Sequence, residues 1–333
     1  MKKVLVSGIK PTGDLTLGNY IGALRNFVAL QDEFESYFFV ADLHALTTGT
    51  VDASELKKAR KTIVALYIAC GLDPNKATIF YQSQVEAHAM MQWLCASETT
   101  LGELQRMTQY KDKATKLKQT NGTNKIPTNL LMYPTLMAGD ILLYNPDIVP
   151  IGEDQTQHLE LTRNIAERLN SKYGASFTLP DGYIPQVGAR IKSLTDPTSK
   201  MSKSEHGTKS TIYLLENPQQ AYNKIMKAVT DSEGKVYISK EKPGILNLLN
   251  IYAALTNMSL KEAEAKFKDY DYKQFKEAVA SEVKSLLEDI QAKYNEALKV
   301  ADEITDAGAA KASYIANKNL NKLMKKMGLY FKK

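Results

Sequence analysis

Short apolar segments alternate with longer amphipathic segments through the first half of this chain of 333 residues. The alternation predicts a parallel β-sheet covered by helices, because parallel strands are joined by helical crossovers. The expected strands are residues 3–7, 36–42, 77–82 and 147–151. The expected helices are residues 18–33, 53–70, 87–97, 102–118, 134–144 and 155–173. We therefore predict an α/β fold with a Rossmann-like parallel sheet.

The second half of the chain is lysine-rich and has helical periodicity. It predicts an α-helical C-terminal domain with helices at residues 221–229, 244–256, 260–267, 272–298 and 307–328. A turn cluster at residues 194–198, Leu-Thr-Asp-Pro-Thr, separates the two patterns. Proline and aspartate favour a turn here, so we expect a hinge.

Composition narrows the class of protein. No run of eighteen apolar residues occurs, and the chain begins with an expected strand rather than a cationic leader, so we predict a cytoplasmic protein that does not enter a membrane. Cys70 and Cys95 lie in apolar helical patterns and should be reduced core residues. Four scattered histidines make a structural metal site unexpected, so we assign no metal ligands. The net charge of +6 favours polyanions weakly.

Polar residues follow each expected strand. They are Ser7-Gly8, Asp42-Leu43-His44, Gln82-Ser83 and the segment 152–155, Gly-Glu-Asp-Gln. Ligands of an open parallel sheet bind at the carboxyl ends of its strands. We therefore expect these segments to surround one site.

Two segments have the chemistry of a phosphate site. The first, residues 7–19, is a glycine-containing turn between a strand and a helix, where the backbone can approach phosphate and amides attract anions. Its spacing is neither that of a dinucleotide fingerprint nor that of a Walker loop. The second, residues 200–204, reads Lys-Met-Ser-Lys-Ser. A lysine-serine loop alone is most often just solvated, but two such segments in this order favour binding of a triphosphate.

The two segments resemble the signatures of class I aminoacyl-tRNA synthetases. Residues 16–19 stand for the HIGH tetrapeptide, and residues 200–204 match KMSKS. Over essentially its full length the chain resembles the bacterial tryptophanyl-tRNA synthetase family, through residues 42–45, 102–111, 140–145, 152–155, 187–191, 229–232 and 242–244. The resemblance implies activation of L-tryptophan by ATP, followed by transfer to the 2′-hydroxyl of the terminal adenosine of tRNA(Trp). It also implies a homodimer.

The resemblance divides the chain into four parts. Residues 1–195 would form the catalytic domain, 196–204 the KMSKS loop, and 205–300 an α-helical domain on the anticodon side of the tRNA. Residues 301–333 would form a helix that packs back on the catalytic domain.

On the ATP side, the resemblance gives catalytic roles to Lys111, Lys200 and Lys203. It assigns ATP binding to Lys10, Pro11, Thr12, Thr16, Gly18, Asn19, Gly152, Glu153, Asp154, Ile191, Lys200, Met201, Ser202, Lys203 and Ser204. Mg²⁺ should accompany ATP, held mainly by its phosphates. Asp154 should also cap the helix that begins at Gln155. Lys111 lies in a basic run, and such a run is usually a solvated face, but its place in a family-matching segment favours a role with the leaving pyrophosphate. The neighbouring lysines could instead touch tRNA phosphates.

On the amino-acid side, helical spacing places Tyr133, Met137 and Asp140 on one face of a helix. An acidic residue there is either a paired core carboxylate or an acceptor for a ligand donor. The resemblance favours the second, with Asp140 accepting the indole N–H. The residues implied to bind tryptophan are Gly8, His44, Tyr133, Met137, Asp140 and Gln155. His44 at a strand end could instead be structural.

Three features leave questions open. Lys10 stands where many bacterial relatives have glutamine, and Val6 where they often have phenylalanine. The polar stretch 118–125 should form a mobile loop. The apolar stretch 90–95 could be core or interface.

Two other functions remain to be distinguished. A tyrosine-specific synthetase shares the fold and also uses carboxylates near the ring. A paralogue without catalysis would bind tryptophan or tRNA only, although Lys200 and Lys203 argue against it.

Overall fold

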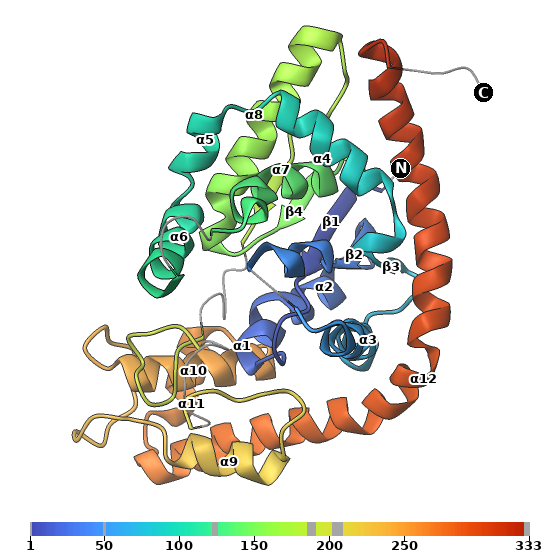
Figure 1. Cartoon of the computed structure of the whole chain (residues 1–333). Helices are drawn as coiled ribbons and strands as arrows, with labels where there is room; N and C mark the ends of the chain where they lie inside the picture. The colour runs from blue at the N-terminus through green and yellow to red at the C-terminus, as the bar shows by residue number, and fades with distance from the viewer. Residues whose placement is uncertain (1, 49–50, 122–125, 185–190, 202–208, 330–333) are drawn as a thin grey trace.

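The computed structural model describes residues 2–48, 51–121, 126–184, 191–201 and 209–329. In these ranges one parallel sheet has the strand order β3-β2-β1-β4-β5 (Figure 1). Its strands are β1 Val4–Ile9, β2 Glu35–Val40, β3 Ala77–Tyr81, β4 Ile148–Pro150 and β5 Asp181–Tyr183. The predicted α/β fold with a C-terminal helical region is confirmed. Strand β5 was not predicted, because all three of its residues are exposed and it has no apolar pattern.

The helices of the sheet region follow the expected order with shifted ends. They are α1 Leu17–Asn19, the π-helix η1 Tyr20–Leu24, α2 Arg25–Leu30, the 3₁₀ turn η2 Leu43–Thr48, α3 Ala53–Ala69, the 3₁₀ turn η3 Gln82–Gln84, α4 Ala87–Ser97, α5 Leu101–Arg106, α6 Thr108–Asn121, α7 Thr128–Leu142, the 3₁₀ turn η5 Glu153–Gln155 and α8 Thr156–Tyr173.

Three expected boundaries were wrong. The helix expected at 102–118 breaks at Met107, whose ψ of 124° is not helical. The helix expected from residue 134 begins at Thr128 and contains Pro134 in its interior, although proline usually starts a helix. The loop expected at 118–125 is helical as far as Asn121, and residues 122–125 lie outside the described ranges.

The second half is helical as expected, with one correction. Its helices are α9 Pro218–Met226, α10 Pro243–Thr256, α11 Leu260–Phe267 and α12 Tyr272–Lys326. The gap expected between 298 and 307 does not exist, since α12 is one helix of 55 residues. No proline or glycine interrupts residues 299–306, and small buried residues continue at helical spacing through Ala297, Ala301, Thr305, Ala309, Ala312 and Ala316.

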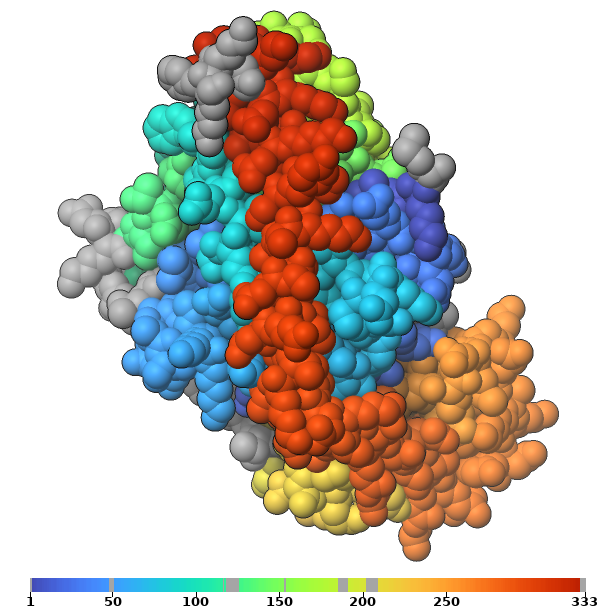
Figure 2. Space-filling view, turned by 90° about the vertical axis from the view of Figure 1, so that its right-hand side faces the viewer, coloured from blue at the N-terminus to red at the C-terminus, as the bar shows by residue number. Residues whose placement is uncertain are grey.

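The long helix α12 connects the two halves of the molecule. Its first part packs on α9 and α10, and its later part packs on α3 and β3 (Figure 1). Figure 2 shows its later part lying across the outside of the sheet region. The core follows the same division. Phe38 and Val40 of β2 join a cluster that includes residues of α10 and α12, whereas Tyr37 and Phe39 point to the other face of the sheet.

Gly308 marks the closest approach of α12 to the sheet. A Cβ at this position would lie 1.9 Å from the carbonyl oxygen of Ile79 in β3. Backbone cannot move aside as a flexible side chain can, so only glycine permits this contact.

We expect Gly308→Ala to destabilise the fold by about 1–3 kcal/mol, because overpacking outweighs the gain in helix propensity of about 1 kcal/mol. Urea unfolding measures the change. Gly102→Ala in α5 is the matched control, because its Cβ would meet only the flexible end of Arg106 at 3.4 Å. Equal or greater stability of Gly308→Ala would contradict the close packing of α12 on β3.

None of the helices in the described ranges is long and apolar enough to cross a membrane.

Candidate active site

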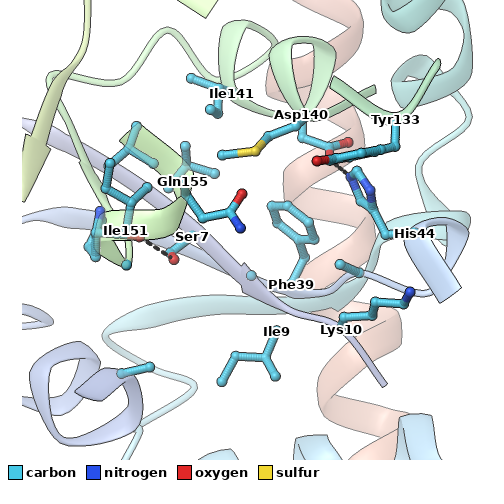
Figure 3. A pocket seen from close by; sticks show the side chains of 18 of the residues that line it. Ser7, Ile9, Lys10, Phe39, His44, Tyr133, Asp140, Ile141, Ile151 and Gln155 are labelled. Atoms are coloured by element: carbon cyan, nitrogen blue, oxygen red, sulfur yellow. Dashed lines mark hydrogen bonds and ion pairs between the residues drawn. The ribbon is translucent and has the colours of Figure 1, made fainter. Parts of the chain in front are cut away.

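A cavity of about 330 Å³ opens between the carboxyl ends of β1 and β4. These neighbouring strands continue to opposite sides of the sheet, β1 toward β2 and β4 toward β5. The cavity therefore lies at the topological switch point, where parallel sheets bind ligands. The hydroxyl of Ser7 donates to the carbonyl of Pro150 at 3.0 Å and ties the two strand ends together (Figure 3).

The cavity brings together all six residues that the sequence assigned to the amino acid. Gly8 comes from β1, His44 from η2, and Gln155 from η5. The other three, from α7, are Tyr133, Met137 and Asp140. Of the residues assigned to ATP, Lys10 and Gly152 also line it. Figure 3 shows His44, Tyr133 and Asp140 gathered on one side and Gln155 and Ile151 on the other.

The carboxylate of Asp140 lies at the buried end of the cavity and accepts three hydrogen bonds. Gln82 Nε2 and His88 Nδ1 donate to Oδ1 at 2.7 and 2.6 Å, and His44 Nε2 donates to Oδ2 at 2.9 Å. Burial opposes its ionisation, but the bonds from His44 and His88 prevail and lower the pKa of Asp140 to about 2. Asp140 is therefore both a paired core carboxylate and a pocket residue. Since a carboxylate has about four lone-pair positions, Oδ2 can accept one more donor from the cavity.

His88 supports Asp140 from behind. Its side chain is fully buried, and its Nε2 lies 2.9 Å from the hydroxyl of Tyr144. Because Nδ1–H donates to Asp140, Nε2 of a neutral ring accepts from Tyr144. The sequence placed Gln82 among the strand-end residues expected around the site but gave it no specific role, and it gave His88 none. His88 lies on α4 with no local pattern that indicates a partner.

A second chain of hydrogen bonds starts at Tyr133, on the same side of the cavity as His44 and Asp140 (Figure 3). The hydroxyl of Tyr133 donates to Gln109 Oε1 at 3.1 Å and lies 2.5 Å from His158 Nε2. Gln109 Nε2 in turn donates to Asp154 Oδ2 at 3.0 Å. Burial and the charge of Lys113 lower the pKa of His158 to about 4, so this ring is neutral at neutral pH. The chain links the amino-acid side of the cavity to the segment assigned to adenosine.

The capping role expected for Asp154 was wrong. The N-cap of α8 is Gln155, which makes no side-chain cap, because residues 153–155 form the 3₁₀ turn η5 before the α-helix starts. The carboxylate of Asp154 instead accepts from Gln109 and from Gln155 Nε2, the latter at 3.1 Å.

The loop after β1 is held in place by backbone geometry. Thr12 N–H donates to the Lys10 carbonyl at 2.9 Å, and Gly13 has a φ of 64°, which glycine adopts without strain. Thr16 and Asn19 then form a capping box, with Thr16 N donating to Asn19 Oδ1 at 3.0 Å. This capping box fixes the orientation of the first turn of α1.

The two signature segments meet in the structure. A Cβ on Gly18 would lie 3.7 Å from Cβ of Ile191 and 3.8 Å from Cβ of Met201. Leu17 N–H also donates to the Ile212 carbonyl at 2.9 Å, so the chain on both sides of the lysine loop packs against α1. Lys200 is exposed and faces Lys192 across a β-bridge. Ser202, Lys203 and Ser204 lie outside the described residues.

Lys113, and not Lys111, reaches the cavity. Both are on α6, but the side chain of Lys111 is exposed, whereas Lys113 lines the cavity with its Nζ 5.4 Å from the centre of the Tyr133 ring. Residues two apart on a helix point in nearly opposite directions. Burial lowers the pKa of Lys113, and nearby Asp154 partly opposes this. Of these two lysines, Lys113 is therefore the better-placed candidate to meet the phosphates.

The sequence and the fold of this chain are both similar to those of known proteins. Residues 2–288 match the family model described as tRNA synthetases class I (W and Y). The chain is 58% identical to a tryptophan–tRNA ligase of Mycoplasmopsis pulmonis (strain UAB CTIP), over 98% of both chains.

Solved structures give the same result. The tryptophanyl-tRNA synthetase of Mycoplasma pneumoniae superposes with a TM-score of 0.92 at 38% identity, covering 99% of each chain. The enzyme of Campylobacter jejuni, complexed with ADP and tryptophan, superposes with a TM-score of 0.79 at 31% identity, covering 98% of this chain and all of that one.

Proposed function

Because this chain belongs to the class I tRNA synthetases of the tryptophan and tyrosine group, we propose that it is a tryptophan–tRNA ligase. It activates L-tryptophan with ATP to tryptophanyl-adenylate and pyrophosphate. It then transfers tryptophan to the 2′-hydroxyl of the terminal adenosine of tRNA(Trp). The observation that carries the choice of amino acid is the Asp140 carboxylate, ionised at the buried end of a largely apolar cavity.

The indole ring fits the part of the cavity whose buried end is formed by Asp140. Its N–H donates to Oδ2, beside His44, while Tyr133, Met137 and Phe39 form the walls. An aromatic ring without this donor leaves a buried carboxylate short of a partner, a larger penalty than a change in apolar contact. Gln155 and Gly8, at the opposite wall and floor, contact the polar end of the amino acid.

Adenylate formation needs positioning and charge stabilisation rather than a protein nucleophile. A carboxylate oxygen of tryptophan forms a bond to the α-phosphorus, the bond from that phosphorus to the bridging oxygen breaks, and its electron pair leaves with pyrophosphate. Lys113, Lys200 and Lys203 offset the negative charge of the leaving group. Mg²⁺ enters with ATP as part of the substrate, held mainly by the phosphates.

ATP binds beside the amino acid, where β1, β4 and the two signature segments meet. Pro11 and Thr12, with the turn at Thr16, Gly18 and Asn19, face the phosphates, and Lys10 stands between the phosphates and the amino acid. The adenosine lies toward Gly152, Glu153, Asp154 and Ile191, and the phosphates extend to Lys200, Met201, Ser202, Lys203 and Ser204. The packing of Gly18 on Ile191 and Met201 supports this arrangement, because it couples the lysine loop to the helix start.

The tRNA uses both halves of the molecule. Residues 1–195 form the catalytic domain and 196–204 its lysine loop, while the helices of 205–300 serve the anticodon side. The part of α12 after residue 300 packs on β3 and α3. This packing supports the proposal, because one helix then holds the anticodon-side helices in a fixed position relative to the catalytic domain. The protein acts in the cytoplasm.

Pyrophosphate exchange into ATP tests this proposal. We expect exchange that depends on L-tryptophan and not on L-tyrosine. Exchange with tyrosine alone would assign the chain to the other branch of its group. Exchange with neither amino acid, in protein that still binds tryptophan, would leave only a binding function.

The functional protein is a homodimer that uses the outer face of α4. Residues 90–95 divide between two environments: Met91, Leu94 and Cys95 are buried, whereas Met90 and Trp93 are 45% and 69% exposed. Met90 and Trp93 lie one turn apart, so their side chains form one apolar patch. Tryptophan is among the residues that contribute most at protein interfaces.

We expect Trp93→Glu to convert the dimer into a monomer, because a charge in the centre of the interface cannot be solvated. Light scattering after gel filtration should give the mass of one chain, 37.1 kDa. Tyr314→Glu on α12 is the matched control, since Tyr314 is an aromatic residue with 70% exposure that lies outside this patch. A Trp93→Glu protein that remains dimeric would rule out this surface.

A further inference from the structure

The ammonium group of Lys10 is anchored to the segment that forms the amino-acid side of the cavity. Lys10 follows β1 and its Nζ donates to Thr47 Oγ1 at 3.3 Å. The Thr47 hydroxyl donates to the His44 carbonyl at 2.8 Å, and the His44 ring donates to Asp140. Figure 3 shows Lys10 directly below His44. One N–H of the ammonium is used by Thr47, so two others remain available to the cavity.

Two cations face this cavity without a paired acid. Lys10, in the loop after β1, and Lys113, on α6, both line it. Within the described ranges neither lysine forms a salt bridge. Partial burial lowers the pKa of both lysines, so an anion bound between them would offset the cost of holding two positive charges in the cavity.

We infer that Lys10 is a catalytic residue whose ammonium binds the carboxylate of the amino acid and aligns it for attack on the α-phosphorus. This inference rests on the proposed function. The ammonium keeps its proton and donates hydrogen bonds to the carboxylate oxygen that does not attack. The attacking oxygen forms the bond to phosphorus, and the electron pair of the broken bond leaves with pyrophosphate.

The division between the two lysines follows from their partners. Lys10 is joined through Thr47 and His44 to Asp140, which receives the ring of the substrate. Lys113 lies over the Tyr133 ring and feels the charge of Asp154, which is next to Gly152 in the segment assigned to adenosine. Lys10 therefore takes the carboxylate of the amino acid, and Lys113 takes the phosphates of ATP.

Capture of the carboxylate should depend on pH. Burial, and then the charge of Lys113, lower the pKa of Lys10 to about 8. The other titratable groups around it are His44 and Asp140, which are joined by one hydrogen bond, and Tyr133, whose hydroxyl contacts His158 and leads through Gln109 to Asp154. Asp140 stays ionised and His158 stays neutral above pH 5, since their pKa values are about 2 and about 4. Lys10 is charged below its pKa, so carboxylate affinity is full there and is lost as the pH rises through about 8.

Calorimetric binding of L-tryptophan and of tryptophanol, without ATP, tests the inference. Tryptophanol retains the ring and the amine but has no carboxylate, so the ratio of the two affinities isolates the carboxylate contact. We expect Lys10→Gln to weaken tryptophan binding about 10- to 100-fold, as for loss of a hydrogen bond to a charged group, and to leave tryptophanol binding unchanged. Lys10→Arg should restore tryptophan binding and remove its decline at alkaline pH, because arginine stays charged.

Two further variants make the test specific. Lys261→Gln, exposed on α11, is the matched control and should bind both ligands as the wild type does. Lys113→Gln should move the alkaline decline to higher pH, because it removes the charge that depresses the pKa of Lys10.

Other outcomes overturn the inference. Equal weakening of both ligands by Lys10→Gln would mean that the residue shapes the cavity and does not bind the carboxylate. Weaker ATP binding with unchanged tryptophan binding would assign Lys10 to phosphate. If the wild type shows no tryptophan-dependent pyrophosphate exchange, the proposed function itself is wrong. If the wild type shows that exchange but Lys10→Gln binds tryptophan as tightly as the wild type does, only the inference about Lys10 is wrong.

Discussion

Asp140→Asn is expected to lower kcat/KM for tryptophan in pyrophosphate exchange by about 10²- to 10³-fold, the cost of breaking a buried, hydrogen-bonded charge. Gln82, His44 and His88 all donate to the Asp140 carboxylate. An asparagine amide offers donors where acceptors are needed, so it cannot satisfy these three residues and the indole N–H together. ATP affinity, measured without amino acid, should change little.

The same substitution reports on stability. The pKa of Asp140 is lowered in the folded state to about 2 from a reference of 3.8. Its ionisation therefore stabilises the fold above pH 3.8, and this contribution is lost as the pH falls toward about 2. In urea unfolding, the wild type should lose more stability than Asp140→Asn over this range.

Asp269→Asn, an exposed substitution after α11, is the control for both measurements. Retention of tryptophan-dependent exchange within a few-fold of wild type by a folded Asp140→Asn protein would show that another group accepts the indole N–H.

Lys113→Ala is expected to lower the rate of tryptophan activation by about 10²- to 10³-fold, as when one preorganised donor to a developing negative charge is removed. Lys113 lines the cavity, is partly desolvated and has no salt bridge among the described residues, so its charge is available to the phosphates. Single-turnover kinetics with saturating tryptophan and ATP measures the step directly.

Lys111→Ala is the matched comparison, because it removes the same charge from the same helix. Its side chain is exposed and does not line the cavity, so activation should stay near the wild-type rate. The reverse result, a large loss for Lys111 and none for Lys113, would mean that α6 rotates or moves when substrates bind.

The contrast between these two lysines shows where sequence reasoning stops. The sequence placed a basic run on a helix that lies beside the cavity, but lysines at 111, 113, 116 and 118 do not show which face of the helix is inward. The phase of α6 is set by its packing, with Ala114 buried in a cluster beside Leu130 and Tyr133 of α7. That packing turns Lys113 toward the cavity and Lys111 toward solvent.

Asp140 shows a different limit. Its position on a helix face with Tyr133 and Met137 was readable from a spacing of three and four residues. Its protonation state was not, because His44 and His88 lie 96 and 52 residues away in sequence. Only the fold brings these donors to the carboxylate, and they decide that the group is ionised despite burial.

The sequence by itself determined the alternation of strands and helices, the strand ends that surround the cavity, and the two signature segments, because each depends on neighbouring residues or on a fixed period. The tertiary structure alone decided the continuity of α12, the short exposed strand β5, the inward face of α6 and the link from Lys10 to Asp140. Those features depend on burial and on hydrogen bonds between distant segments, and no local pattern encodes the free energy of such contacts.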